Sequence, residues 1–206
     1  DVLNTILQHV SISGYPYGYR VLAKLGAYRP ELSAWSFEYF GELSLWAKIR
    51  ELSSQRISSS QKIKFDIIKK YYILGISAFF RGWHNSGKNI LPGVISPNNV
   101  IIPELDFRES TLINSINGWK KYTNPLQFFD AIIHNFYKKT IIHYPWLESI
   151  LDTKWICNAC VEALGIEDGK QFLTNLSNEI QHFNNNSYLE FNTKISEFIN
   201  NSLPFL

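Results

Sequence analysis

The sequence lacks methionine altogether and has only two cysteines, Cys157 and Cys160, among 206 residues. Two cysteines three positions apart cannot build a disulfide framework, so we expect a reducing compartment and a cytoplasmic location. A complete translation product carries an initiator methionine. Its absence favours a processed chain, a domain excised from a larger protein, or a sequence from which some residues were lost.

Long apolar runs are also missing. The longest, Tyr71–Phe80, is about half of the ~20 residues that a bilayer crossing needs. The first residues show neither the basic segment nor the apolar stretch of a secretory signal. We therefore expect no transmembrane segment.

Charge is scarce as well, and the formal net charge is only +2. Residues 1–90 hold 12 Lys or Arg against 6 Asp or Glu, whereas residues 91–206 hold 8 against 12. Nucleic-acid binding calls for a dense basic stripe, which is absent, so we expect no nucleic-acid partner. The basic half could face an anionic partner, but we favour mutual complementation of the two halves because the total is so small.

Aromatic side chains are what the chain has in excess. They make up 15% of the residues and include six Trp, within a composition that is 45% hydrophobic. Such a composition is typical of a globular protein. Because each aromatic ring buries a large area, it predicts either a thick core or an aromatic-lined pocket.

Apolar residues recur at helical spacing over most of the chain, which predicts a mostly α fold. The strongest pattern covers Glu31–Leu52, and the next covers Lys62–Arg81. We predict a single helical domain spanning residues 1–206, a bundle of about seven to eight helices packed around these two. Further helices are predicted over Val2–Val10, Arg20–Ala27, Leu126–Tyr144, Trp146–Leu164, Asp168–Phe183 and Tyr188–Leu203.

The helical pattern breaks for long only near residues 82–109. Pro92-Gly93 and Pro97-Asn98-Asn99 interrupt this segment, and β-branched residues lie between them. The pattern predicts an irregular loop or a short hairpin. Loops of this length in compact domains are uncommon and tend to be lids or binding segments, so we expect a site beneath it.

Two short motifs resemble functional ones but lack the required context. Gly82–Asn89 comes within one residue of a phosphate-binding loop, yet Asn89 replaces the hydroxyl that holds Mg²⁺ and a helix pattern precedes it. We interpret it as a glycine-ended helix followed by a turn. Cys157 and Cys160 lie within a helix pattern and lack further zinc ligands, so we interpret them as buried, unreactive thiols. The sequence indicates no metal site and identifies no cofactor.

Two clusters could carry acid–base catalysis. Asp130, His134 and Lys138 are spaced four residues apart on one helix face, and an aspartate can orient a histidine as a general base. The same spacing is typical of a surface electrostatic ladder. The second cluster is Glu104, Asp106, Arg108 and Glu109, for which capping of a following helix is the alternative.

The leading functional hypothesis is a helical binding domain that holds an apolar or aromatic small molecule, alone or as the substrate-holding part of a larger enzyme. The first alternative is a protein–protein interaction or scaffold module without catalysis. The second is a hydrolase or transferase that uses Asp130 and His134 or the acidic cluster Glu104–Glu109. The lysines of Lys62–Arg81 also suit peripheral contact with an anionic membrane. The residues expected to line the small-molecule site are Trp35, Tyr39, Trp83, His84 and Trp119.

Overall fold

The computed structural model describes residues 25–32, 34–37, 44–54, 61–91, 95–102, 111–112, 120–149, 154–182, 197, 199–201 and 203–205. This part of the chain is mostly α-helical, as predicted, and contains six α-helices, and its strands pair only two by two. The predicted total of seven to eight helices and the single domain concern the whole chain and stay predictions. The helix predicted over Arg20–Ala27 is wrong in its last part, because Leu25–Arg29 is a strand, and the one predicted over Val2–Val10 lies outside the described residues.

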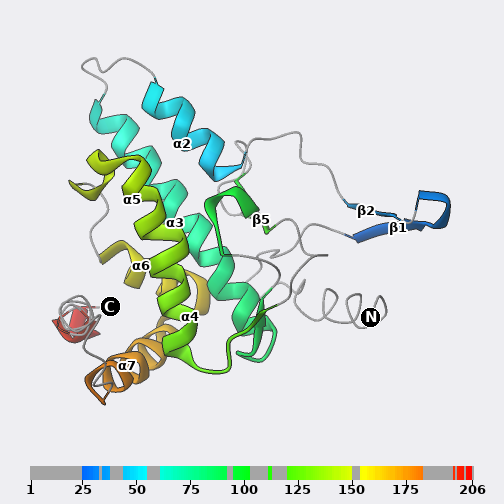
Figure 1. The fold of residues 1–206 in the computed structure, drawn as a ribbon. Coiled ribbons are helices and arrows are strands. Elements are labelled where there is room, and N and C mark those ends of the chain that lie inside the picture. Colours follow the sequence, from blue (N-terminus) through cyan, green and yellow to red (C-terminus); the bar gives the residue numbers. More distant parts are fainter. Residues whose placement is uncertain are drawn as a thin grey trace.

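Helix α3 (Gln61–Asn85) is the longest element and runs through the middle of the helical body (Figure 1). From Ile76 to Trp83 every residue is buried, because apolar side chains occur on all sides of this stretch. A helix of this kind must be surrounded, and α3 packs against α6 (Lys154–Leu164), α2 (Leu45–Ser54) and the short strands that follow it. The helix predicted over Lys62–Arg81 is confirmed and extends to Asn85.

Helix α3 ends in a glycine-based cap. The N–H of Gly87 donates to the carbonyl of His84, and the N–H of Lys88 donates to the carbonyl of Trp83, both at 3.0 Å. Gly87 has φ +73°, the left-handed conformation that a cap with these two hydrogen bonds requires. The interpretation of Gly82–Asn89 as a helix end and turn is therefore confirmed. The irregular segment predicted to begin at residue 82 begins only after this cap.

The segment after the cap forms short antiparallel ladders. Strand β3 (Ile90–Leu91) pairs with β6 (Lys120–Lys121), and β4 (Val100–Ile101) pairs with β5 (Thr111–Leu112). Three β-branched residues of this segment, Ile90, Val100 and Ile101, lie in these ladders. These ladders place Tyr122 beside the end of α3, where its N–H donates to the carbonyl of Asn89 at 2.6 Å.

A second rod lies in front of α3 in Figure 1 and consists of α4 (Pro125–Ile132), a π-helical segment (Ile133–Lys138) and α5 (Lys139–His143). Asn124 caps it, since its Oδ1 accepts hydrogen bonds from the N–H groups of Leu126 and Gln127 at 2.6 and 3.2 Å. The sequence predicted this helix to within a residue at either end. The wider π turn was not predicted.

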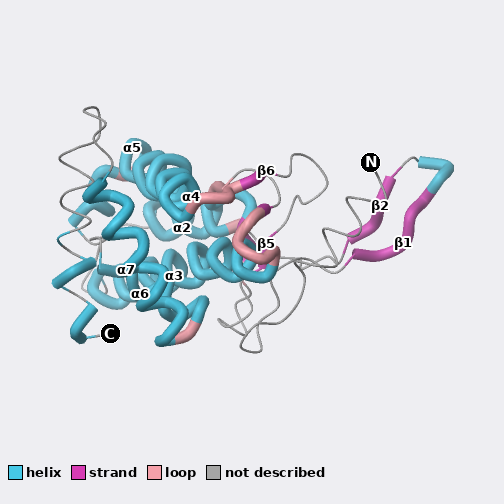
Figure 2. The backbone as a smooth tube through the Cα atoms, turned by 90° about the horizontal axis from the view of Figure 1, so that it is seen from below, coloured by secondary structure: helices cyan, strands magenta, loops and turns pink. Residues whose placement is uncertain are grey.

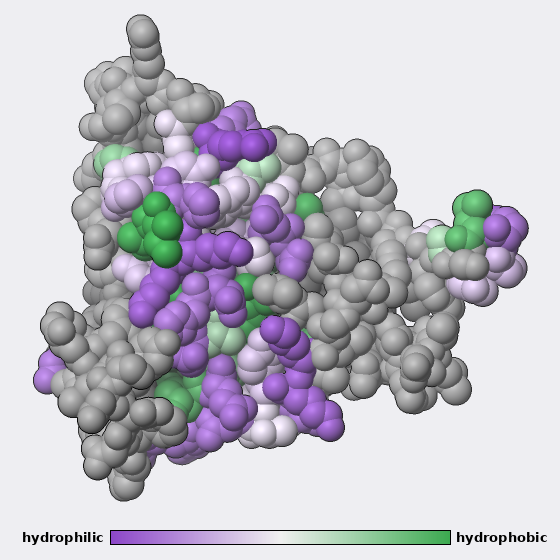
Figure 3. Space-filling view, viewed as in Figure 1, coloured by the Kyte–Doolittle hydropathy of each residue, from purple (hydrophilic) through white to green (hydrophobic). Residues whose placement is uncertain are grey.

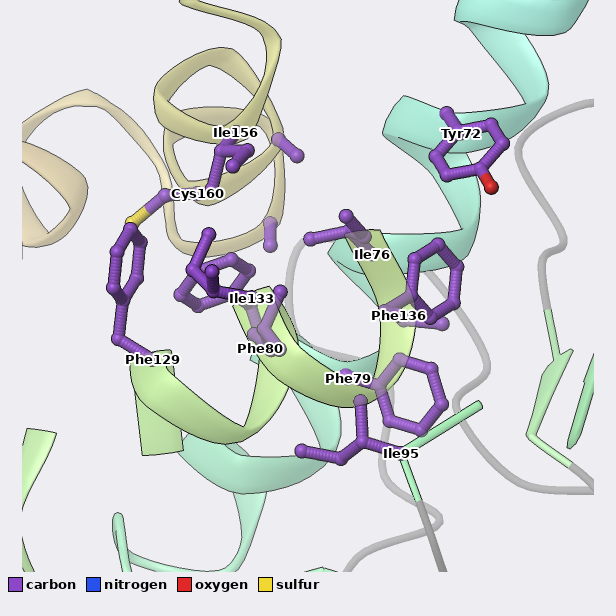
Figure 4. Packing of buried hydrophobic residues seen from close by; sticks show 14 of the residues in the cluster. Tyr72, Ile76, Phe79, Phe80, Ile95, Phe129, Ile133, Phe136, Ile156 and Cys160 are labelled. Carbon is purple, nitrogen blue, oxygen red and sulfur yellow. The ribbon is translucent and has the colours of Figure 1, made fainter. Parts of the chain in front are cut away.

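The π turn delivers one aromatic ring to the centre of the core. The ring of Phe136 meets those of Tyr72 and Phe79 edge-on, with centroids 5.4 and 5.8 Å apart (Figure 4). Gly75 of α3 gives this ring its space, because a Cβ there would lie 3.2 Å from Phe136 Cζ. The side chain of Thr140 donates to the carbonyl of Phe136 at 2.7 Å and so satisfies a polar group at the end of the turn.

Helices α6 and α7 (Ile166–His182) form a close pair joined by Gly165, whose φ is +84°. A Cβ at Gly169 would lie 2.9 Å from the Cα of Val161, so a glycine is needed where the two backbones approach. The continuous helix predicted over Trp146–Leu164 is wrong in its first part, where Pro145–Ser149 forms a 3-10 turn and α6 begins only at Lys154. The restricted backbone of a proline favours such a break.

The N-terminal part corrects the strongest helix prediction, Glu31–Leu52. Strand β1 (Leu25–Arg29), a 3-10 turn (Pro30–Leu32) and strand β2 (Ala34–Phe37) form an antiparallel ribbon, and α2 begins at Leu45. Aromatic residues three or four apart suit a helix, but Trp35 and Phe37 also fit the two-residue period of a strand. The ribbon also requires glycine at position 26, because a Cβ there would collide with Ser36 Oγ on the opposite strand.

Candidate functional site

Trp83 was expected to line a small-molecule site, and the structure places it inside a closed aromatic cluster. Its ring is fully buried, stacks on Phe128 with centroids 4.6 Å apart, and meets Phe172 edge-on at 5.4 Å. Its indole Nε1–H donates to the carbonyl of Tyr122 at 2.8 Å. Protein groups therefore occupy one face, one edge and the polar tip of the indole.

His84 follows Trp83 but takes part in a different arrangement. Its half-buried imidazole lies with Nε2 3.6 Å from Oδ2 of Asp168. His84 is in the last turn of α3 and Asp168 in the first turn of α7. Helix dipoles favour a cation at the first place and an anion at the second, so each side chain lies where its own helix end would stabilise its charged form.

The other residues expected at this site are not brought to Trp83 by the described part of the chain. Trp35 lies in β2, on the ribbon, whereas Trp83 lies in the helical body (Figure 1). Tyr39 and Trp119 lie outside the described residues, and so does the acidic cluster Glu104–Glu109. The proposed small-molecule site thus stays a prediction.

Asp130 and His134 do meet, as their spacing indicated. Nε2 of His134 lies 3.4 Å from Oδ1 of Asp130, with the imidazole about one-third exposed and the carboxylate about half exposed. His134 belongs to the π turn, a kind of irregularity that is frequent at functional sites. The pair could orient an imidazole, but a nucleophile and an oxyanion-stabilising group are also needed for the predicted hydrolase or transferase chemistry.

Two buried polar side chains of α3 were not singled out by the sequence. Arg81 is fully buried and its Nη1 donates to Ser77 Oγ at 3.0 Å, one turn earlier on the helix. Tyr72 is fully buried beside the π turn, and burial raises the pKa of its hydroxyl well above the ordinary range. Neither was found from the sequence, because the apolar residues around them dominate the helical pattern.

The cysteines are buried on α6, as their interpretation expected. Cys160 Sγ lies 4.0 Å from the carbonyl oxygen of Gly169, across the α6–α7 contact. Burial, with a smaller contribution from Cys157, raises the pKa of the Cys160 thiol well above its ordinary value of 9.0. A protonated thiol is a poor nucleophile and a poor metal ligand. Within the described ranges, no three His, Cys, Asp or Glu side chains gather as metal ligands do.

Among the residues that the structure describes, large apolar side chains are exposed at three places. The ribbon exposes Tyr28 and Leu32, and Leu32 is 72% exposed. The end of the second rod exposes Ile142, which is 76% exposed, and the 3-10 turn after it exposes Trp146. The start of α7 exposes Ile166. On the face that Figure 3 shows, hydrophobic residues of the described part stand as separate spots among hydrophilic ones. Ile142 belongs to the apolar pattern of the helix predicted over Leu126–Tyr144, but the structure exposes its side chain.

Among the described helices, none combines the length and the apolar composition needed to cross a membrane. Comparison with protein-family models, curated proteins and solved structures finds no match for this chain. Inference about function therefore depends on the geometry above.

Proposed function

We propose that the chain is a protein-interaction module that offers the β1–β2 ribbon to a partner protein. The observation that carries the proposal is the position of the ribbon, which extends away from the helices with Leu32 at its tip (Figure 2). Every residue from Gly26 to Leu32 is exposed. An aromatic and a leucine side chain in such a place gain from being covered.

The backbone of the ribbon supports the same function. A two-stranded hairpin is only marginally stable in water by itself, so contact with a further surface would stabilise it. Its edges also provide N–H and C=O groups that can pair with an extended segment of another protein. The register pairs Tyr28 with Trp35 and Leu25 with Phe37, with an irregularity between Leu25 and Tyr28. Tyr28 of this ladder is 44% exposed and so is available for a side-chain contact.

Site-specific photo-crosslinking tests this function. A benzophenone amino acid at Leu32 should give a discrete adduct of defined mass in cells that express the full chain. The same probe at Thr174, an exposed position of α7, is the matched control. The substitution Tyr28→Ser should reduce the Leu32 adduct. Equal labelling at both positions, or none at Leu32, would exclude the ribbon as the contact surface.

The small-molecule hypothesis stays a second proposal, with Trp35, Tyr39, Trp83, His84 and Trp119 as its residues. The excess of aromatic residues favours it, whereas the filled surroundings of Trp83 favour a core role for that ring. Native mass spectrometry of the purified full chain distinguishes the two. A retained small molecule that disappears on denaturation supports the second proposal, and the mass of the bare chain opposes it.

A further inference from the structure

We infer that the end of the second rod is a docking surface for an anionic lipid membrane. The surface, called the α5 patch below, consists of Lys138, Lys139, Ile142, His143 and Trp146. It is separate from the β1–β2 ribbon, so the two proposals stand or fall independently.

Ile142 is the apolar centre of the α5 patch. Successive residues of a helix are about 100° apart, so Ile142 points away from Thr140, which is buried toward the core. With 76% of its surface exposed, the isoleucine projects from the molecule. A single projecting aliphatic side chain at a helix end suits insertion between lipid headgroups.

Trp146 gives the α5 patch an amphipathic ring. The indole is 37% exposed and is held against Phe65 of α3, with ring centroids 5.7 Å apart and planes inclined by 34°. One part of the ring is thus fixed to the helical body and another part faces solvent. Indole rings of this kind favour the boundary between headgroups and hydrocarbon.

Charge selects an anionic surface. Lys138 and Lys139 lie one turn before Ile142, and His143 follows it; the five residues of α5 include no acid. Lysines around an inserted apolar residue attract acidic headgroups. An acidic protein would match the same charge, but a stable protein interface buries about 800 Å² on each partner. One isoleucine and part of one indole provide too little apolar surface for that, and they are sufficient for shallow insertion.

A second exposed isoleucine, Ile166, serves as the control for Ile142. Ile166 is 56% exposed at the start of α7, with Glu162, Glu167 and Asp168 around it in sequence, all exposed. It has the same side chain in acidic surroundings. If hydrophobicity alone produced vesicle binding, both isoleucines would contribute.

The test is sedimentation of the full chain with vesicles of phosphatidylcholine, with and without one-third phosphatidylserine. Binding should require phosphatidylserine and fall in high salt. Ile142→Ser should weaken the partition coefficient about tenfold. Lys139→Glu should weaken it by roughly thirtyfold, because it changes two units of charge. Ile166→Ser should leave it unchanged, and far-UV circular dichroism of each variant verifies folding.

Three results would overturn the inference. They are no binding to the phosphatidylserine vesicles, equal binding to both vesicles, and equal losses for Ile142→Ser and Ile166→Ser. Soluble polyglutamate serves as a probe of the acidic-protein alternative. If polyglutamate displaces the vesicles and its own binding survives Ile142→Ser, the patch is a charged protein-binding surface and the lipid assignment is wrong.

Discussion

The rings of Trp83 and Phe128 stack with their planes only 15° apart, and this contact joins the end of α3 to the beginning of α4. Phe128 also meets Phe80 and Tyr122 at centroid distances of 5.2 and 5.8 Å. The stacked pair is therefore the point at which two helices and the strand pair β3–β6 are held together. At this point the aromatic side chains, which the chain has in excess, pack against one another in the core.

Removal of the Trp83 ring should destabilise the fold severely. Trp83→Ala leaves a cavity among rings and leaves the carbonyl of Tyr122 without its indole donor, so we expect a loss of about 3–5 kcal/mol in the free energy of unfolding. Trp146→Ala, at a partly exposed ring, should cost less than about 2 kcal/mol. Urea denaturation followed by far-UV circular dichroism measures both. Equal losses would contradict the assignment of Trp83 to the core.

Gly75 should resist replacement even though it lies inside a helix. Alanine is about 1 kcal/mol better than glycine in a helix interior. At this position, however, a Cβ would lie 2.7 Å from Leu45 Cδ2 and 3.2 Å from Phe136 Cζ. We expect Gly75→Ala to lower the free energy of unfolding by about 1–2 kcal/mol, because overpacking outweighs helix propensity.

The control for Gly75→Ala is Glu162→Ala, on an exposed position of α6. It should change stability by no more than about 0.5 kcal/mol. The two variants are compared by urea denaturation under the same conditions. A stabilising Gly75→Ala would show that Leu45 and Phe136 move aside without cost.

The helices that the sequence predicted best are those whose ends carry chemical signals. Asn124-Pro125 begins α4 and Gly165 separates α6 from α7, and both are local signals that tertiary contacts reinforce. The ribbon was missed because spacing alone cannot separate a helix from two short strands when aromatic residues are dense. The ribbon requires glycine at position 26, because a Cβ there would collide with Ser36, ten residues away. Only the folded backbone reveals this requirement.

The candidate sites were less predictable than the fold. Spacing did bring Asp130 to His134, because both lie on one rod. The link from His84 to Asp168 joins helices far apart in the sequence, and no local pattern indicates such a pair. The exposure of Ile142 depends on the direction in which the π turn and the end of α5 face. A periodic pattern with 3.6 residues per turn does not encode that direction.

The His84–Asp168 pair should couple α3 to α7 weakly but measurably. Both side chains are partly exposed, so we expect a coupling free energy of about 0.3–1 kcal/mol at low salt. A double-mutant cycle with His84→Gln, Asp168→Asn and the double variant isolates it by urea denaturation. The coupling should shrink at high salt, because solvent ions screen partly exposed charges. A salt-independent value would oppose an ionic link.

Stability should decline in alkaline solution because of buried acids, among them Cys160 and Tyr72. Burial raises the pKa of the Cys160 thiol above its ordinary 9.0 and that of Tyr72 above its ordinary 10.0. The unfolded chain therefore releases these protons first as the pH rises, which favours unfolding. The contribution is fully present below the unfolded pKa of each group. It is lost progressively above about pH 9 for the thiol and above about pH 10 for the phenol.

Two variants separate these contributions. Cys160→Ala should reduce the slope of unfolding free energy against pH between about pH 9 and 10, where one thiol accounts for at most ~1.4 kcal/mol per pH unit. Tyr72→Phe should leave that interval unchanged and reduce the slope above about pH 10. Slopes are compared rather than absolute stabilities, because each substitution also alters packing.

Native Cys160 should also react with Ellman's reagent only as fast as the chain opens, since its thiol is buried. Fast labelling of the folded chain, or unchanged slopes in both variants, would show that these side chains are accessible to water.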